Sequence, residues 1–202
     1  MTAQLLVPSL SPNQELPNPD KPHVVQFTVE QFQLMAEKGV FTDSDRYELI
    51  NGEIIAMSPI GLKHAVYVGR LTNNLVIKLG IRVIVWSQNP IDLANKSQPQ
   101  PDIAVLKYRD DFYEEALPTP ADILLIAEVA DSSLEYDRDV KANLYAAAGV
   151  PQMWLFDVNT KTITGFSQPS EFGYKQIYRY TQGDRLSILA FDDVVFEWKE
   201  LF

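Results

Sequence analysis

Apolar residues recur at every third or fourth position between Lys63 and Leu79. That spacing places them on one face of an α-helix, and such a face packs against a protein core. Gly80 follows directly, and glycine often ends a helix because it adopts left-handed backbone angles at little steric cost. The pattern therefore predicts a core helix over residues 63–79. Its apolar positions are Val68, Leu71, Leu75, Val76 and Leu79.

Apolar runs on the C-terminal side of this helix predict three strands. Two of them, Arg82–Trp86 and Asp102–Leu106, are strand-like runs. The third, Ile123–Ala127, is apolar throughout, as expected for a strand that is buried on both faces. A polar, acidic loop precedes it. We expect Glu128 to stand at the end of this strand, because a charge inside it would be very unfavourable.

A second helix is predicted from about Tyr136 to Ala148, where Gly149 would end it. Met153–Asp157 then predicts a further strand, so that the core order is helix, three strands, helix, strand. The remainder has turn signals at Asn159 and at Gly183-Asp184, and it predicts a hairpin and an edge strand.

Two more elements are predicted on the N-terminal side of this core. Thr28 followed by Gln31 fits the capping box of a short helix that ends near residue 37. Asn51-Gly52 lies between two β-rich runs, and this dipeptide is a strong signal for a tight hairpin.

Length and composition predict one domain. The chain has 202 residues, of which 46% are hydrophobic, which is enough for one well-filled α/β domain but hardly for two. Residues 1–24 hold five of the 13 prolines and show no apolar period. We therefore expect a flexible N-terminal arm over residues 1–24 and a single domain over residues 25–202.

The composition also narrows the chemistry. Cysteine is absent, so a metal would be bound by oxygen ligands or by one of two histidines, which favours magnesium or manganese. The apolar stretches are shorter than the ~20 residues of a membrane-spanning helix, and we expect a cytoplasmic protein with no membrane partner and no organic cofactor. The net charge of -10 argues against a passive nucleic-acid coat. It does not exclude a nuclease, since metal-binding carboxylates add negative charge.

Two carboxylates stand where a nuclease site would need them. Cleavage of a phosphodiester with a hard cation requires carboxylates that converge on one point and a lysine nearby. Asp102 opens a strand directly after Pro101, and Glu128 ends the apolar strand. If these strands are neighbours, both carboxylates lie at one edge of the sheet. Taken singly, each is more typical of a solvated strand end.

Lys141 is the candidate lysine. It shares one narrow sector of the second helix with Asp137, Leu144 and Ala148, so charged groups occupy the apolar stripe. Because these groups lie in the first turns, soon after Glu128, Lys141 can extend along the sheet to the carboxylates. The alternative is a surface pair between Asp137 and Lys141, worth ~0.3–0.5 kcal/mol. Spacing alone leaves both interpretations open.

Several short motifs occur in one order along the chain. They are Arg46–Glu53, Met57-Ser58-Pro59, His64, Pro101-Asp102, Glu128-Val129, Asp137-Arg138, Lys141, Tyr145 and Gly149-Val150-Pro151. In this arrangement the chain resembles the Uma-type putative restriction endonuclease family, a branch of the PD-(D/E)XK nuclease superfamily, over about residues 27–202. The resemblance implies the α/β fold of that superfamily, a restriction-endonuclease-like core in which helices flank a mixed sheet, here with added hairpins.

The resemblance also implies a function. It assigns Asp102 and Glu128 as the acids that bind magnesium or manganese, Glu48 as a supporting carboxylate, and DNA as the substrate. The superfamily places a lysine two residues after the second acid, but that position is Ala130 here. In the resembling family the lysine has moved onto the following helix, which points to Lys141 as the group that orients or deprotonates the attacking water. Two cuts in a duplex would favour a two-fold homodimer.

Other polar residues are weaker candidates. Lys63, His64 and Arg70, near the start of the first helix, would be placed to contact a phosphate, although a solvated helix face is the more common explanation for such residues. The acidic loop lacks the spacing of a calcium loop and is predicted to be solvated. Its acids are Asp110, Asp111, Glu114 and Glu115.

Two function classes follow from the sequence. The first is a metal-dependent endonuclease that hydrolyses DNA. The second is a nuclease-fold protein of weak or lost activity that serves nucleic-acid binding or assembly. The candidate acids and Lys141 favour the first class, whereas the acidic composition and the missing lysine at Ala130 favour the second.

Overall fold

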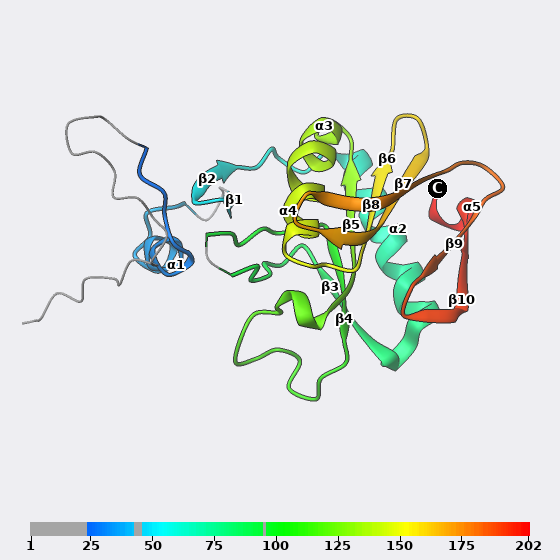
Figure 1. The fold of residues 1–202 in the computed structure, drawn as a ribbon, viewed down its shortest axis with the longest axis horizontal. Helices are drawn as coiled ribbons and strands as arrows, with labels where there is room; N and C mark the ends of the chain where they lie inside the picture. Colours follow the sequence, from blue (N-terminus) through cyan, green and yellow to red (C-terminus); the bar gives the residue numbers. More distant parts are fainter. Residues whose placement is uncertain (1–23, 43–45, 95) are drawn as a thin grey trace, which may run out of the picture.

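A six-stranded mixed sheet forms the centre of the computed structural model, which describes residues 24–42, 46–94 and 96–202 (Figure 1). The strand order is β3-β4-β5-β6-β7-β8, in which β5 and β6 pair in parallel and the other neighbours are antiparallel. The strands are β3 (Val83–Ser87), β4 (Ile103–Lys107), β5 (Ile123–Ala130), β6 (Gln152–Asp157), β7 (Thr162–Ser170) and β8 (Gly173–Tyr180). Apart from Val24, the predicted N-terminal arm lies outside the described residues.

The first core helix forms as predicted, as α2 (Leu62–Leu79). Its buried residues are Val68, Leu71, Leu75 and Leu79. Val76, which also belongs to the predicted stripe, is half exposed at the edge of that face. Gly80 ends the helix with a φ of +58°. None of the helices in the described ranges has the length and apolar character needed to cross a membrane.

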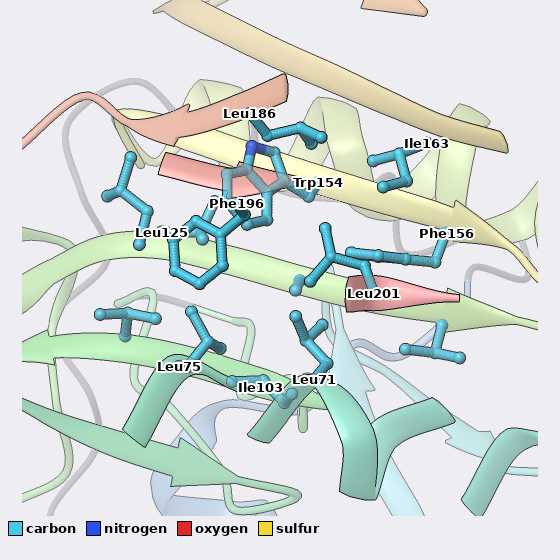
Figure 2. Packing of buried hydrophobic residues seen from close by; sticks show 14 of the residues in the cluster. Leu71, Leu75, Ile103, Leu125, Trp154, Phe156, Ile163, Leu186, Phe196 and Leu201 are labelled. Carbon is cyan, nitrogen blue, oxygen red and sulfur yellow. The ribbon is translucent and has the colours of Figure 1, made fainter. Parts of the chain in front are cut away.

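The larger hydrophobic core lies between α2 and the sheet. Figure 2 shows Leu71 and Leu75 of α2 beneath Leu125 of β5, with Trp154 of β6 and Phe196 on the other side of the cluster. All five side chains are at most 1% exposed. This packing fixes the sheet against α2, and a second cluster on the opposite face holds the helices that follow β5.

The C-terminal region has more structure than the predicted hairpin and edge strand. A hairpin of β7 and β8 extends the sheet, and β8 is its edge. The following elements are β9 (Arg185–Ile188), β10 (Phe191–Glu197) and α5 (Trp198–Leu201). β9 and β10 form a separate two-stranded sheet whose Leu186 and Phe196 pack onto the core of α2. Local alternation shows that a strand forms, but it does not show which sheet the strand joins.

The helical crossover between β5 and β6 departs from a regular helix. It consists of α3 (Leu134–Tyr136), a π-helical segment η3 (Asp137–Lys141) and α4 (Ala142–Ala147). In η3 the Ala142 N–H donates to the carbonyl oxygen of Asp137, five residues earlier. The prediction of one regular helix from about residue 136 to 148 was therefore right in position but missed the wider turn, and such turns recur at functional sites.

Glu128 does not end its strand, contrary to the prediction. β5 runs on to Ala130, so that Glu128 lies inside the strand opposite Leu155 of β6. Val129 and Ala130 continue the parallel pairing with β6, and this pairing keeps the backbone extended beyond the charge. The sheet therefore holds the Glu128 carboxylate in a fixed position on the face that α4 covers.

A short hairpin, β1 (Tyr47–Ile50) and β2 (Glu53–Ala56), lies beside the main sheet (Figure 1). Its turn is Asn51-Gly52, as predicted, and both residues have positive φ. The Gly52 N–H donates to Lys96 O at 2.7 Å, and the Gly52 carbonyl accepts from Phe27 N–H at 2.8 Å. The hairpin is thereby tied to two other segments.

The predicted N-terminal helix is α1 (Val29–Glu37), and it has the expected capping box of Thr28 and Gln31. Its Val29 and Phe32 pack with Leu49 of the hairpin. This small cluster holds α1 against the hairpin, and an antiparallel bridge between Leu49 and Gln98 joins β1 to the segment that precedes β4.

We expect Gly52→Ala to destabilise the protein more than Gly39→Ala. Both glycines have left-handed angles, with φ of +81° and +68°, which cost an alanine about 1–2 kcal/mol. A Cβ at Gly52 would also lie 2.6 Å from the Cβ of Gln26, whereas one at Gly39 would meet nothing within 4 Å. Urea unfolding should show a loss of about 1–2 kcal/mol for Gly39→Ala and about 3 kcal/mol or more for Gly52→Ala. Equal losses would contradict the close approach at the turn.

Candidate active site

Charged side chains from four separate segments meet beside one end of β5. Glu48 comes from β1, Asp102 directly precedes β4, Glu128 lies in β5 and Lys141 ends η3. Their exposed fractions are 2%, 8%, 2% and 3%. The Lys141 Nζ lies 3.3 Å from Glu48 Oε2 and 3.3 Å from Glu128 Oε1. The structure thus brings together the residues that the sequence proposed as catalytic.

Asp102 and Glu128 are held together by the pairing of their strands. β4 and β5 are antiparallel neighbours, with Ile103 opposite Ala127. The Asp102 N–H donates to Glu128 Oε2 at 3.1 Å, and the Val129 N–H donates to Asp102 Oδ2 at 2.9 Å. Each carboxylate therefore accepts a backbone hydrogen bond beside the other acid, which offsets part of the free energy lost on burying them.

Lys141 forms no surface pair with Asp137, because both side chains are buried. Asp137 accepts instead from Ser133 Oγ at 2.6 Å. Tyr145, four residues after Lys141, donates its hydroxyl to Glu128 Oε1 at 2.7 Å. Along the crossover, the side chains of Asp137, Lys141 and Tyr145 are thus all buried near the same carboxylates, and the surface-pair alternative is not what the structure shows.

Asp137 and Tyr145 belong to the site, although neither was predicted to have a role in it. Asp137 is 4% exposed and Tyr145 is fully buried. The helical spacing of four residues from Lys141 on either side was the available signal, and both residues also fall in the motifs of the family resemblance. Spacing alone did not show that the face of the crossover that carries Asp137, Lys141 and Tyr145 lies against Glu128.

His64 is the other basic side chain that joins the acids. It lies in the first turn of α2, and its Nε2 is 2.9 Å from Asp102 Oδ1. Lys63 and Arg70 point elsewhere: the Lys63 Nζ donates to Asn159 Oδ1 at 2.6 Å, and the Arg70 guanidinium lies 5.7 Å from the centre of the Tyr67 ring. Of the three residues proposed to contact a phosphate, only His64 reaches the site among the described residues.

Burial disfavours the ionised form of Glu128, and the neighbouring cation does not fully offset this. Burial raises the pKa of Glu128 to about 8, aided by repulsion from Asp102 and Asp137 and opposed by the attraction of Lys141. Burial also raises the pKa of Asp137. For Lys141, burial alone would lower the pKa, but the attraction of Glu128 and Glu48 outweighs it, and the pKa lies well above its ordinary value. Lys141 therefore stays protonated. The carboxyl groups around it outnumber the side chains that can carry a positive charge.

A cavity of about 480 Å³ gives access to these groups. Glu48, Asp102, Glu128 and Lys141 all line it, together with His64. The segment between β2 and α2 contributes an apolar wall. Its apolar residues are Met57, Pro59 and Ile60. A volume of this size suits one small part of a ligand, such as a phosphate with its neighbouring sugar.

The donor set fits a divalent metal ion. Magnesium prefers carboxylate oxygens, and it is commonly bound by one or two carboxylates, with water and substrate phosphates completing its shell. Asp102 and Glu128 lie side by side, and an added cation would compensate the excess negative charge. No group of three or more His, Asp or Glu side chains is arranged to hold a metal by itself in residues 24–42, 46–94 and 96–202. The carboxylate oxygens there accept from Lys141, Tyr145 and backbone N–H groups instead.

The acidic loop before β5 stays apart from this site. Asp110, Glu114 and Glu115 are exposed, and Asp111 forms an ion pair with Arg109. The prediction that this loop is solvated therefore agrees with the structure.

Comparison with known proteins supports a nuclease-like fold. A sequence profile of the family described as Putative restriction endonuclease (Uma2) matches residues 29–198. Among solved structures, a putative nuclease belonging to DUF820 from Anabaena variabilis superposes with a TM-score of 0.70 at 15% sequence identity, over 87% of this chain and 97% of that chain. A search of curated proteins found no match. The structural likeness shows that the fold predicted from the sequence is correct.

The pH dependence of stability tests the uncompensated charge around Glu128. Because its folded pKa of about 8 exceeds the ordinary 4.5, the folded protein holds a proton that the unfolded chain has lost between these values. The stability from this group is complete below about pH 4.5 and is lost as the pH rises towards 8, on the order of 1 kcal/mol per pKa unit. Urea unfolding in EDTA should show this decline, and Glu128→Gln should flatten it. A wild-type stability that stays constant over this range would contradict the assignment.

Proposed function

Since the chain belongs to the Uma2 family of putative restriction endonucleases, we propose that it is a metal-dependent endonuclease that hydrolyses the phosphodiester bonds of DNA. The observation that carries the proposal is the convergence of Glu48, Asp102, Glu128 and Lys141 on one cavity. These are the carboxylates and the lysine that such hydrolysis needs, and they come from segments far apart in the sequence.

Asp102 and Glu128 would hold magnesium or manganese, which when bound polarises the phosphate and activates water as the nucleophile. The two acids have little freedom to move, because each accepts a backbone N–H next to the other. A fixed arrangement of this kind lowers the barrier by removing the need to reorganise groups during the reaction.

Lys141 has the role of orienting the attacking water and of stabilising negative charge on the phosphate. The sequence left two roles open for Lys141, orienting the attacking water or deprotonating it. Because its raised pKa makes Lys141 a poor base, we propose that it orients the water and does not deprotonate it. Glu48 supports it, since Glu48 Oε2 lies 3.3 Å from Lys141 Nζ and also accepts the Gln100 N–H at 3.2 Å. Glu48 thereby keeps the ammonium beside Glu128.

The packing around Ala130 supports the view that the lysine has moved to the helix. Ala130 lies two residues after Glu128 and therefore on the same face of β5. It is fully buried in the cluster that contains Ala142 and Tyr145. A lysine at position 130 would have to displace this packing, whereas Lys141 approaches Glu128 from the crossover.

The cleavage test compares site variants with matched variants elsewhere. We expect supercoiled plasmid and single-stranded DNA to be cleaved with magnesium or manganese but not with EDTA. Asp102→Asn and Lys141→Gln should each lower the rate about 100-fold or more, since they remove groups that act on the developing charge. Asp193→Asn and Lys78→Gln should retain wild-type rates, because these residues form ion pairs with Arg82 and Glu200 away from the cavity.

The outcomes separate the two function classes. Cleavage that survives in Lys141→Gln would remove the lysine from the mechanism. If the folded wild-type protein cleaves no substrate, and Asp102→Asn binds DNA as the wild type does, the protein is a nuclease-fold binding protein. Paired cuts in a duplex would favour a two-fold dimer. Sedimentation of the active species would show whether it is such a dimer.

Metal binding can be tested without any activity. A ligand that binds only the folded state adds about 2.7 kcal/mol of stability at 100 times its Kd. We therefore expect magnesium or manganese to raise the free energy of unfolding of the wild type and of Asp193→Asn, but not that of Asp102→Asn. An equal gain in Asp102→Asn would show that the cation binds elsewhere.

A further inference from the structure

An anion that enters the cavity meets mostly carboxylates. The acids that line it are Glu48, Asp102, Glu128, Asp131 and Asp137. Among the described lining residues, those that can carry positive charge are Arg46, His64 and Lys141. A DNA phosphate is repelled by the acids, so its binding requires a cation that is still able to pair with it.

Two of these three groups already have carboxylate partners. Lys141 lies between Glu48 and Glu128, and His64 contacts Asp102. Arg46 differs, because no ion pair joins it to a carboxylate within the described part of the chain. Its Nη2 donates to the neutral side-chain oxygen of Gln100 at 2.9 Å.

A hydrogen bond holds the Arg46 side chain in place but does not use all of its N–H donors. The residue directly precedes β1, and its carbonyl oxygen accepts the Met57 N–H at 2.8 Å across the hairpin. A guanidinium presents five N–H donors in a planar fork and keeps its charge at every physiological pH. The bond to Gln100 uses one donor, and the remaining donors suit two oxygens of one phosphate.

We propose that Arg46 binds the DNA phosphate in this cavity. The inference rests on the proposed nuclease function and adds a substrate-binding residue to it. Gln100 is the positioning residue, since its side chain holds the guanidinium while its backbone N–H donates to Glu48 at 3.2 Å. One residue thereby sets the distance between the phosphate anchor and the catalytic carboxylates.

The alternative is that Arg46 only braces the hairpin against the segment of Gln100. Both roles predict some loss of activity when Arg46 is changed, so activity alone does not separate them. Salt dependence does, because each phosphate contact releases counterions, and removing one contact lowers the slope of log K against log salt by about one unit. Loss of a brace leaves that slope unchanged.

The test measures the affinity of a fluorescein-labelled DNA duplex, and of one of its single strands, over a range of salt concentrations in EDTA. For Arg46→Met we expect about tenfold weaker binding at low salt, a slope smaller by about one unit, a higher KM in magnesium and an unchanged unfolding curve. Arg46→Lys should recover the slope. Gln100→Leu should keep the slope but lower kcat/KM, because the charge remains while its position is lost.

Arg185→Met is the matched control, since it also removes one arginine but from an exposed ion pair with Glu197, outside the cavity lining. It should bind and cleave as the wild type does. A wild-type slope in Arg46→Met, or an equal decrease in Arg185→Met, overturns the role of Arg46 while cleavage by the wild type still stands. If the wild type neither binds nor cleaves DNA, the proposed function fails and this inference fails with it.

Discussion

The Lys141 ammonium between Glu48 and Glu128 is the interaction on which the rest of this site depends. Buried carboxylates are strongly unfavourable unless a cation and hydrogen bonds compensate them. Lys141 lies 3.3 Å from both glutamates, and Tyr145 donates to Glu128 as well. The compensation is incomplete, because burial still raises the pKa of Glu128 to about 8. A further cation in the cavity would favour the ionised form of Glu128, because it would supply the attraction that Lys141 alone does not provide.

Each element of the fold contributes to holding these charges together. Antiparallel pairing of β4 and β5 places Asp102 beside Glu128, where the Asp102 N–H donates to the Glu128 carboxylate and the Val129 N–H donates to the Asp102 carboxylate. The crossover brings Lys141 back over the same face, and its π-helical segment lies where the lysine is needed. The hairpin supplies Glu48 from outside the main sheet. The lysine of the candidate site thus need not come from the strand that carries Glu128, because the crossover after that strand reaches the same point.

Much of the fold could be predicted because it depends on local patterns. The apolar period of α2, the continuous apolar run of β5 and the Asn51-Gly52 turn each determine an element through interactions within a few residues. Where prediction was wrong, neighbours in space decided. Pairing with β6 carried β5 past Glu128, and the sequence alone did not show that β9 and β10 would form a separate sheet.

The sequence by itself determined which residues are available to the site: the carboxylates Asp102 and Glu128, the displaced Lys141 and, by resemblance, Glu48. Only the tertiary structure decided that they meet, that Lys63 does not join them, and that Lys141 is buried between acids instead of paired on the surface. The reason is physical. Local spacing fixes backbone conformation and the face on which a side chain lies, whereas burial, pKa and ion pairing depend on segments that are distant along the chain.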